Sequence, residues 1–191
     1  DAICQLDWHM LREVCDFLCR QPEAQRRRIA VNFSRWHFND PEFLARLCAI
    51  VDEHGLPHRL ISVEITESAA VAHGPDVVDW VNAVKEAGFQ VAMDDFGSGY
   101  SSLNMLSSIP IDVLKMDMAF VQNIEHEEKD VRLVELILNI AENLKVPVVA
   151  EGVEEEEQLN VLRRMGCDIV QGYYFSPPLP AERFGELINQ E

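Results

Sequence analysis

Six short runs of β-branched and other apolar residues recur along the chain, and they limit the folds it can adopt. Near-continuous apolar composition is typical of strands buried on both faces, as in a parallel sheet. The runs are IAVNF (29–33), LISVEI (60–65), FQVAMD (89–94), DVLKMD (112–117), VPVVAE (146–151) and DIVQG (168–172). The chain is therefore expected to build a parallel sheet.

Stretches with helical periodicity separate these runs. Two of them begin at Pro41 and Pro75 and end at Gly55 and Gly88, which are common start and stop residues of helices. The expected helices cover residues 4–20, 41–55, 75–88, 131–144 and 155–166. Strands that alternate with helices predict βα units.

Each apolar run ends at or near a polar residue. These residues are Asn32, Glu64, Asp94 with Asp95, Lys115, Glu151 and Gln171. In a TIM-type barrel such residues ring the mouth where catalysis takes place, whereas an open doubly wound sheet binds its ligand at one switch point. Six polar strand ends favour the barrel. Because a TIM barrel has eight units and the first helix precedes every run, we expect at least one strand upstream of residue 1.

The polar strand ends supply oxygen ligands. The adjacent carboxylates of Asp94 and Asp95 repel each other and lose hydration together, so a cation between them would stabilise the pair. With Asn32, Glu64 and Glu151 they form an oxygen set that suits Mg²⁺ or Mn²⁺. Asp94 could bridge two such ions, which is an arrangement that catalyses phosphoryl displacement.

Simpler explanations exist for each of these residues alone. Asp94 and Asp95 could cap a turn, because a glycine follows closely. Glu64 could be a salt-bridge partner, and Lys115 could lie on the surface instead of near an attacking water or a phosphate. The hypothesis of an active site depends on the set. We expect Trp8, Trp36 and Trp80 to lie in the core.

The charge of the chain restricts its partners. A formal charge of −17 should repel polymeric nucleic acid and anionic membranes, so a phosphate ligand would need local cations. No apolar run approaches the length of a membrane span, and five cysteines without zinc-site spacing are typical of free thiols in the cytoplasm. The first residue is not Met, so we expect a cytoplasmic fragment of a longer protein, which could itself be membrane-anchored.

Several motifs resemble, in order and spacing, the EAL family of cyclic-di-GMP phosphodiesterases. They are VNFS (31–34), EITES (64–68), DDFGSGYSS (94–102), LKMD (114–117), AEGVE (150–154) and QGYYFSPP (171–178). The resemblance implies a TIM-like (β/α)8 barrel, incomplete at its N-terminus. It also implies that residues 1–191 are a single phosphodiesterase domain that hydrolyses cyclic di-GMP to linear pGpG with two Mg²⁺ or Mn²⁺ ions.

The same resemblance implies a role for each site residue. One ion would be bound by Asn32, Glu64 and Asp94, and the other by Asp94, Asp95 and Glu151. The residues implied around the attacking water are Lys115 and Gln171, with Glu154 supporting Lys115. Glu67 would anchor the loop after Asp95, which couples dimerisation to metal binding in the family, and Thr66 and Asp117 would contact the dinucleotide.

Two features depart from the family pattern. The Glu-Ala-Leu motif is absent and is expected upstream of residue 1, which leaves the chain one metal ligand short. Met118 stands where the family often has Arg. The resemblance also implies a homodimer and an upstream sensor or diguanylate cyclase domain. Two alternatives stay open: a catalytically inactive receptor for cyclic di-GMP, and a scaffold with no nucleotide role.

Overall fold

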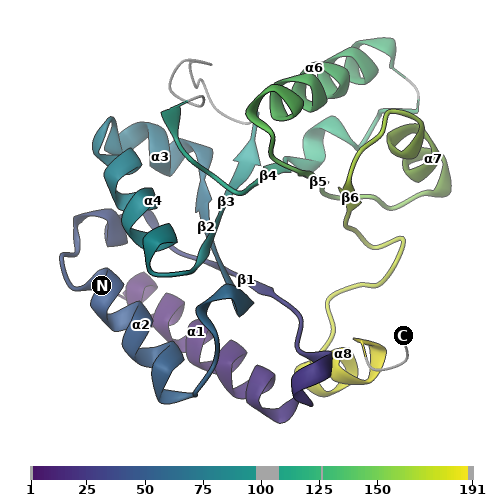
Figure 1. Ribbon diagram of the computed structural model, residues 1–191. Helices are drawn as coiled ribbons and strands as arrows, with labels where there is room; N and C mark the ends of the chain where they lie inside the picture. The colour runs from purple at the N-terminus through teal and green to yellow at the C-terminus, as the bar shows by residue number, and fades with distance from the viewer. Residues whose placement is uncertain (1, 98–107, 126, 189–191) are drawn as a thin grey trace.

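A single curled sheet organises the computed structural model, which describes residues 2–97, 108–125 and 127–188 (Figure 1). Within these ranges six strands pair in chain order, and every pair is parallel. The strands are β1 (Ile29–Asn32), β2 (Ile61–Thr66), β3 (Gln90–Phe96), β4 (Val113–Met116), β5 (Val148–Ala150) and β6 (Ile169–Val170). The predicted parallel α/β architecture is confirmed, and the sheet forms an incomplete, half-closed barrel.

Helices cover the convex side of the sheet (Figure 1). The α-helices are α1 (Ala2–Arg20), α2 (Phe43–Glu53), α3 (Glu67–His73), α4 (Asp76–Glu86), α6 (Glu128–Leu144), α7 (Glu156–Arg164) and α8 (Ala181–Ile188). The 3₁₀ helices are η1 (Glu23–Gln25), η2 (Arg35–Asn39), η3 (His58–Leu60) and η4 (Met118–Phe120). The sequence patterns did not predict α3 or α8, because seven or eight residues are too few to show a helical period.

Successive side chains of a strand point to opposite faces of the sheet, so one face carries the hydrophobic core and the other carries the polar residues. In β2, Val63 and Ile65 are buried in the hydrophobic core, and Glu64 between them points to the other face. The same alternation places Leu114 and Met116 of β4 in the core, with Lys115 opposite. The concave face of the half-barrel therefore carries the polar residues.

The tryptophans do not share one environment. Trp8 is 3% exposed and contacts Phe33 and Phe43, and Trp80 packs partly buried against the same cluster. Trp36 is 52% exposed, so its predicted core position is wrong. The reason is local: Phe33 and His37 fill the inward positions of the segment that carries it.

No helix in the described ranges is long and apolar enough to cross a bilayer. Helices α1, α2, α4 and α6 instead each bury apolar residues along one face. On α1 that face comprises Trp8, Leu11, Cys15 and Leu18, at spacings of three and four residues. It packs beside β1, which places the start of α1 near the carboxyl end of the sheet.

Candidate active site

Strand register brings the polar residues to one end of the sheet. Asn32 pairs with Glu64, and Thr66 pairs with Asp94 on the next strand. Because all pairs are parallel, the carboxyl ends of the strands share one edge, and the βα connections after them surround it.

Lys115 lies at the centre of this edge and is only 8% exposed. Its Nζ donates to Glu64 Oε1 at 2.8 Å, to Asp94 Oδ1 at 2.9 Å and to Glu151 Oε1 at 2.7 Å. Glu64 and Asp94 are buried, at 4% and 8% exposed, and Glu151 is half-buried. The ion pairs join residues of β2, β3 and β4 and the residue after β5. A surface position for Lys115 is thereby excluded.

The electrostatics of this cluster favour a further positive charge. Burial lowers the pKa of Lys115, but the hydrogen bonds that its ammonium donates to Glu151 and Glu64 outweigh this effect, and the net pKa lies above its usual value. Burial raises the pKa of Glu64, although Lys115 opposes that rise. Three carboxylates share one ammonium, so the cluster carries a formal excess of two negative charges.

A β-bulge explains how two adjacent aspartates can serve one site. Met93 pairs with Leu114 and Phe96 pairs with Met116, so Asp94 and Asp95 together face Lys115. Asp95 has φ 54°, in the left-handed region, and its N–H donates to Asp94 Oδ1 at 3.0 Å. In a regular strand the two side chains would point to opposite faces.

The surroundings of Asp95 are acidic. Burial raises the pKa of Asp95, and the nearby charges of Asp94 and Asp117 raise it further, while Lys115 opposes them. Its left-handed backbone is uncommon for a residue other than glycine, and such backbone strain clusters at functional sites. Asp95 therefore belongs to the same electrostatic group as Lys115.

The donor set fits a hard cation. Every anionic donor of the cluster is an oxygen, which is the ligand type that Mg²⁺ and Mn²⁺ prefer. Among the described residues no group of three His, Cys, Asp or Glu residues is arranged to hold a metal ion, and the three carboxylates contact the ammonium of Lys115. One oxygen of each of these three carboxylates, which would bind a cation, is thus engaged by Lys115.

Three predicted site residues are exposed at the rim. Asn32 lies on edge strand β1, across from Glu64. Gln171 follows β6, and its N–H donates to the carbonyl of Ala150 at 2.8 Å. Glu154 follows β5 and is also exposed. The structure places all three on the carboxyl side of the sheet, but it shows no ion pair between Glu154 and Lys115 among the described residues.

The two predicted dinucleotide contacts cap short helices. Thr66 Oγ1 accepts a hydrogen bond from Ala69 N at 3.3 Å, at the start of α3. Asp117 Oδ1 accepts from Ala119 N at 2.7 Å, at the start of η4. Both side chains remain half-buried at the rim. These capping contacts fix the backbone where β2 and β4 leave the sheet.

Glu67 holds the chain that follows the two aspartates. Its side chain is 2% exposed, and its Oε2 accepts a hydrogen bond from Gly97 N at 2.6 Å. Gly97 has φ 93°, and a Cβ there would collide with the ring of Phe120. The start of this loop is thus fixed between α3 and η4. The remainder of the DDFGSGYSS motif, residues 98–102, lies outside the described residues.

Replacing Gly97 by Ala is expected to lower the free energy of unfolding by about 1–3 kcal/mol, because the methyl group overpacks against Phe120. The matched control is Gly74→Ala, since Gly74 also has a positive φ but no atom within 4 Å of the added Cβ. Urea unfolding of both variants separates the clash from backbone strain. Equal losses in the two variants would show that Phe120 is irrelevant.

Gln158 is a buried residue that the sequence analysis missed. Its Oε1 accepts from Glu154 N at 2.8 Å and from Glu155 N at 3.1 Å, and its Nε2 makes a longer contact of 3.5 Å with the carbonyl of Gln122. It thereby joins the connection after β5 to the connection after β4. Its spacing could have revealed it: Gln158 lies three residues after Glu155, the N-cap of α7, where a glutamine side chain can cap the start of a helix.

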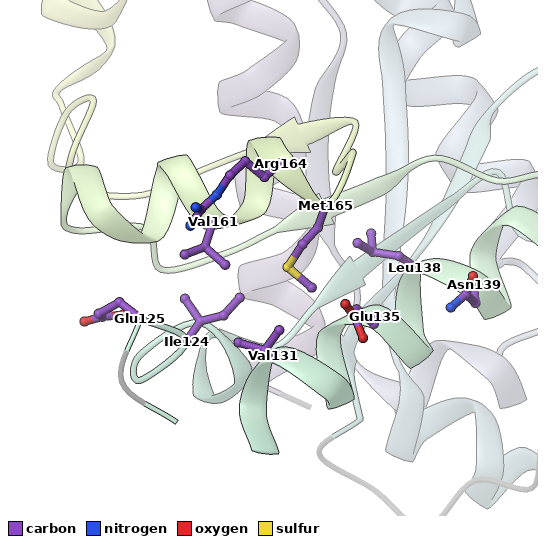
Figure 2. A pocket seen from close by; sticks show the side chains of 9 residues that line it. All are labelled: Ile124, Glu125, Val131, Glu135, Leu138, Asn139, Val161, Arg164 and Met165. Carbon is purple, nitrogen blue, oxygen red and sulfur yellow. The ribbon is translucent and has the colours of Figure 1, made fainter. Parts of the chain in front are cut away.

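One hollow lies away from this edge. A hollow of about 620 Å³ lies between α6 and α7, and Figure 2 shows Val161 and Arg164 of α7, with Met165 just after it, facing Ile124 and Val131 across the hollow. None of the carboxylates around Lys115 lines it. The candidate active site is therefore the carboxyl edge of the sheet.

Comparisons with known proteins match the chain to one domain family. The EAL domain family model matches residues 1–178. The chain is 35% identical over 187 residues to Cyclic di-GMP phosphodiesterase NbdA of Pseudomonas aeruginosa. This match covers 97% of this chain and 24% of that protein. The curated relatives are longer proteins, of which the chain spans 21% to 30%.

Solved structures with the same fold include ligand complexes. The PaMucR phosphodiesterase in complex with c-di-GMP has a TM-score of 0.90 and 31% identity, and the match covers 96% of this chain and 75% of that chain. Klebsiella pneumoniae BlrP1, in a manganese and cyclic di-GMP complex, has a TM-score of 0.83 and 27% identity, over 91% of this chain and 44% of that chain. The fold is thus shared with structures that hold a divalent cation and a cyclic dinucleotide.

Proposed function

The chain belongs to the EAL domain family, and from that premise we propose that it hydrolyses cyclic di-GMP to linear pGpG with two Mg²⁺ or Mn²⁺ ions. The observation that carries the proposal is the cluster of Glu64, Asp94 and Glu151 around Lys115, at the carboxyl ends of neighbouring strands. The excess of negative charge at this partly buried edge attracts cations. Bound cations would in turn neutralise the charge of a substrate phosphate.

The proposed ligands divide between two ions. Asn32, Glu64 and Asp94 would hold one, and Asp94, Asp95 and Glu151 would hold the other. When bound, the two cations would supply an activated water and would stabilise the charge on the leaving oxygen. The bulge at Asp94 and Asp95 supports this division, because it sets both aspartates opposite the single residue Lys115 of β4.

Lys115 would act as a hydrogen-bond donor. Its raised pKa means that it stays protonated at neutral pH, so it is unsuited to remove a proton from water. A fixed ammonium can instead orient the water and stabilise negative charge on a phosphate oxygen. Gln171 would position the same water with its amide, and Glu154 would support Lys115.

The remaining residues would bind and organise the substrate. Thr66 and Asp117, at the starts of α3 and η4, would contact the dinucleotide. Glu67 would fix the loop after Asp95 through Gly97. We further propose that residues 1–191 are one cytoplasmic, dimer-forming domain of a protein that carries an upstream sensor or diguanylate cyclase domain and that could itself be membrane-anchored. That part of the proposal depends on the family resemblance alone.

A receptor that binds cyclic di-GMP without cleaving it is the alternative. Inactive members are expected to lose several metal ligands, whereas every predicted ligand downstream of the Glu-Ala-Leu position is present in this chain. The presence of these ligands favours the enzyme over the receptor. An assay of pGpG release separates the two functions.

The expected result is release of pGpG that requires Mg²⁺ or Mn²⁺ and stops with a chelator. The assay should use the protein as the organism produces it and, in parallel, residues 1–191 alone. The isolated chain should turn over poorly, because a site short of one ligand binds metal weakly and β1 and β6 expose strand edges. Tight binding without any release of pGpG by the natural protein would favour the receptor.

A further inference from the structure

An exposed tryptophan stands at the carboxyl end of β1. Trp36 is 52% exposed, whereas Trp8 and Trp80 pack in the core cluster. It lies on η2, which begins three residues after Asn32, so it belongs to a connection that borders the proposed mouth. The exposed indole of Trp36 offers a flat apolar face to a ligand at this connection.

A cation accompanies this ring. The guanidinium of Arg35 lies over the ring of Trp36, 5.2 Å from its centroid. Within the described residues Arg35 makes no ion pair with a carboxylate, although the chain carries a net charge of −17. A positive charge that is not neutralised by a neighbour is available to a phosphate.

A small hollow adjoins the pair. It measures about 210 Å³, and its walls come from η2 and α3, the connections that follow β1 and β2. The lining residues are Arg35, Trp36, Phe38, Asn39, Ala69, Ala72 and His73. This volume lies below the roughly 300–1,000 Å³ that whole drug-sized ligands occupy, so it suits a fragment such as one base.

We propose that this hollow is a base-binding subsite. One guanine base of the cyclic dinucleotide stacks on the face of Trp36 opposite Arg35, and Arg35 lies near the adjoining phosphate. The inference rests on the proposed function, because it takes cyclic di-GMP as the ligand. Stacking on an aromatic ring beside a cation is a general mode of binding bases, and charge complementarity selects a phosphate-bearing ligand in this acidic chain.

The test is a titration of the natural protein with cyclic di-GMP in Ca²⁺, followed by tryptophan fluorescence and by calorimetry. BlrP1 was solved with calcium and cyclic di-GMP, which is why this ion is chosen. The unmodified protein should show quenching. Trp36→Phe should lose most of the quenching while it keeps most of the affinity, because phenylalanine still stacks.

Trp36→Ala should weaken binding about 5- to 150-fold, which corresponds to stacking of about 1–3 kcal/mol per base. In the Mg²⁺-dependent assay the same variant should raise KM and leave kcat nearly unchanged, because Trp36 does not touch the reacting atoms. The matched control is Leu136→Ala on α6, which removes a similarly exposed apolar side chain, 55% exposed, that lines none of the site. It should change neither Kd nor KM.

The possible failures are distinguishable. If the unmodified protein neither binds nor cleaves cyclic di-GMP, the proposed function itself is overturned, and the subsite with it. If it binds normally and Trp36→Ala has the same Kd as Leu136→Ala, the subsite is overturned while the proposed function stands. Unchanged melting temperatures of the variants would exclude a folding defect as the cause.

Discussion

Changing Asp94 to Asn is expected to reduce hydrolysis of cyclic di-GMP by at least about 10²–10³-fold. Asp94 is the residue proposed to bridge both ions, so one substitution weakens both cation sites. The fold should survive, because Asn has nearly the same shape and the change removes one of three carboxylates that share the ammonium of Lys115. The metal-free variant should melt at the same or a higher temperature than the unmodified protein.

The measurements are Mg²⁺-dependent release of pGpG and thermal melts with and without metal. Asp112→Asn is the matched control, since Asp112 precedes β4 at the opposite end of the same strand pair. There it pairs with Lys85 at 2.6 Å and accepts a hydrogen bond from Val91 N at 2.9 Å. It should lower the melting temperature equally with and without metal. Near-normal turnover by Asp94→Asn would exclude the two-metal mechanism.

Changing Lys115 to Met is expected to reduce turnover by about 10²–10⁴-fold, because the donor proposed to orient the water and stabilise phosphate charge is lost. The same change should strengthen the response of the melting temperature to Mg²⁺. In the structure the ammonium occupies the centre of Glu64, Asp94 and Glu151, so it competes with a cation for their oxygens.

The pH dependence of this variant has a definite sign. The pKa of Glu64 is already raised by burial, with Lys115 opposing the rise, so loss of the ammonium should raise it further. A carboxyl whose pKa is higher in the folded state binds its proton more tightly there. Its stabilising effect is therefore present at low pH and is lost as pH rises through the folded pKa. Metal-free Lys115→Met should melt at a higher temperature at about pH 5 than at pH 7.

Two results would contradict this account of Lys115. Turnover close to that of the unmodified protein would show that the ammonium has no part in the reaction. A Mg²⁺-induced rise in melting temperature that is no larger than in the unmodified protein would show that Lys115 and the metal do not compete. Lys85→Met is a suitable control, because Lys85 pairs with Asp112 away from the site.

The order and type of the six strands and of five α-helices could be predicted from the sequence. The run at 29–33 became β1 (Ile29–Asn32), and the helix expected over 75–88 became α4 (Asp76–Glu86). Such elements follow from local patterns: apolar runs that can be buried on both faces, and start and stop residues that act on the backbone beside them. The polar residues at the strand ends were visible for the same reason, and parallel pairing then places them at one edge.

Contacts between elements were decided only by the tertiary structure. Lys115 reaches three carboxylates from three other parts of the chain, which requires the register between strands. The bulge that sets Asp94 and Asp95 together opposite Lys115 arises from pairing with β4, whereas a regular strand would place one residue opposite Lys115. Trp36 is exposed because Phe33 and His37 occupy the inward positions beside it. Local sequence specifies backbone conformation, but the neighbours of a side chain are set by residues far away in the chain, which assemble only when the sheet and helices pack.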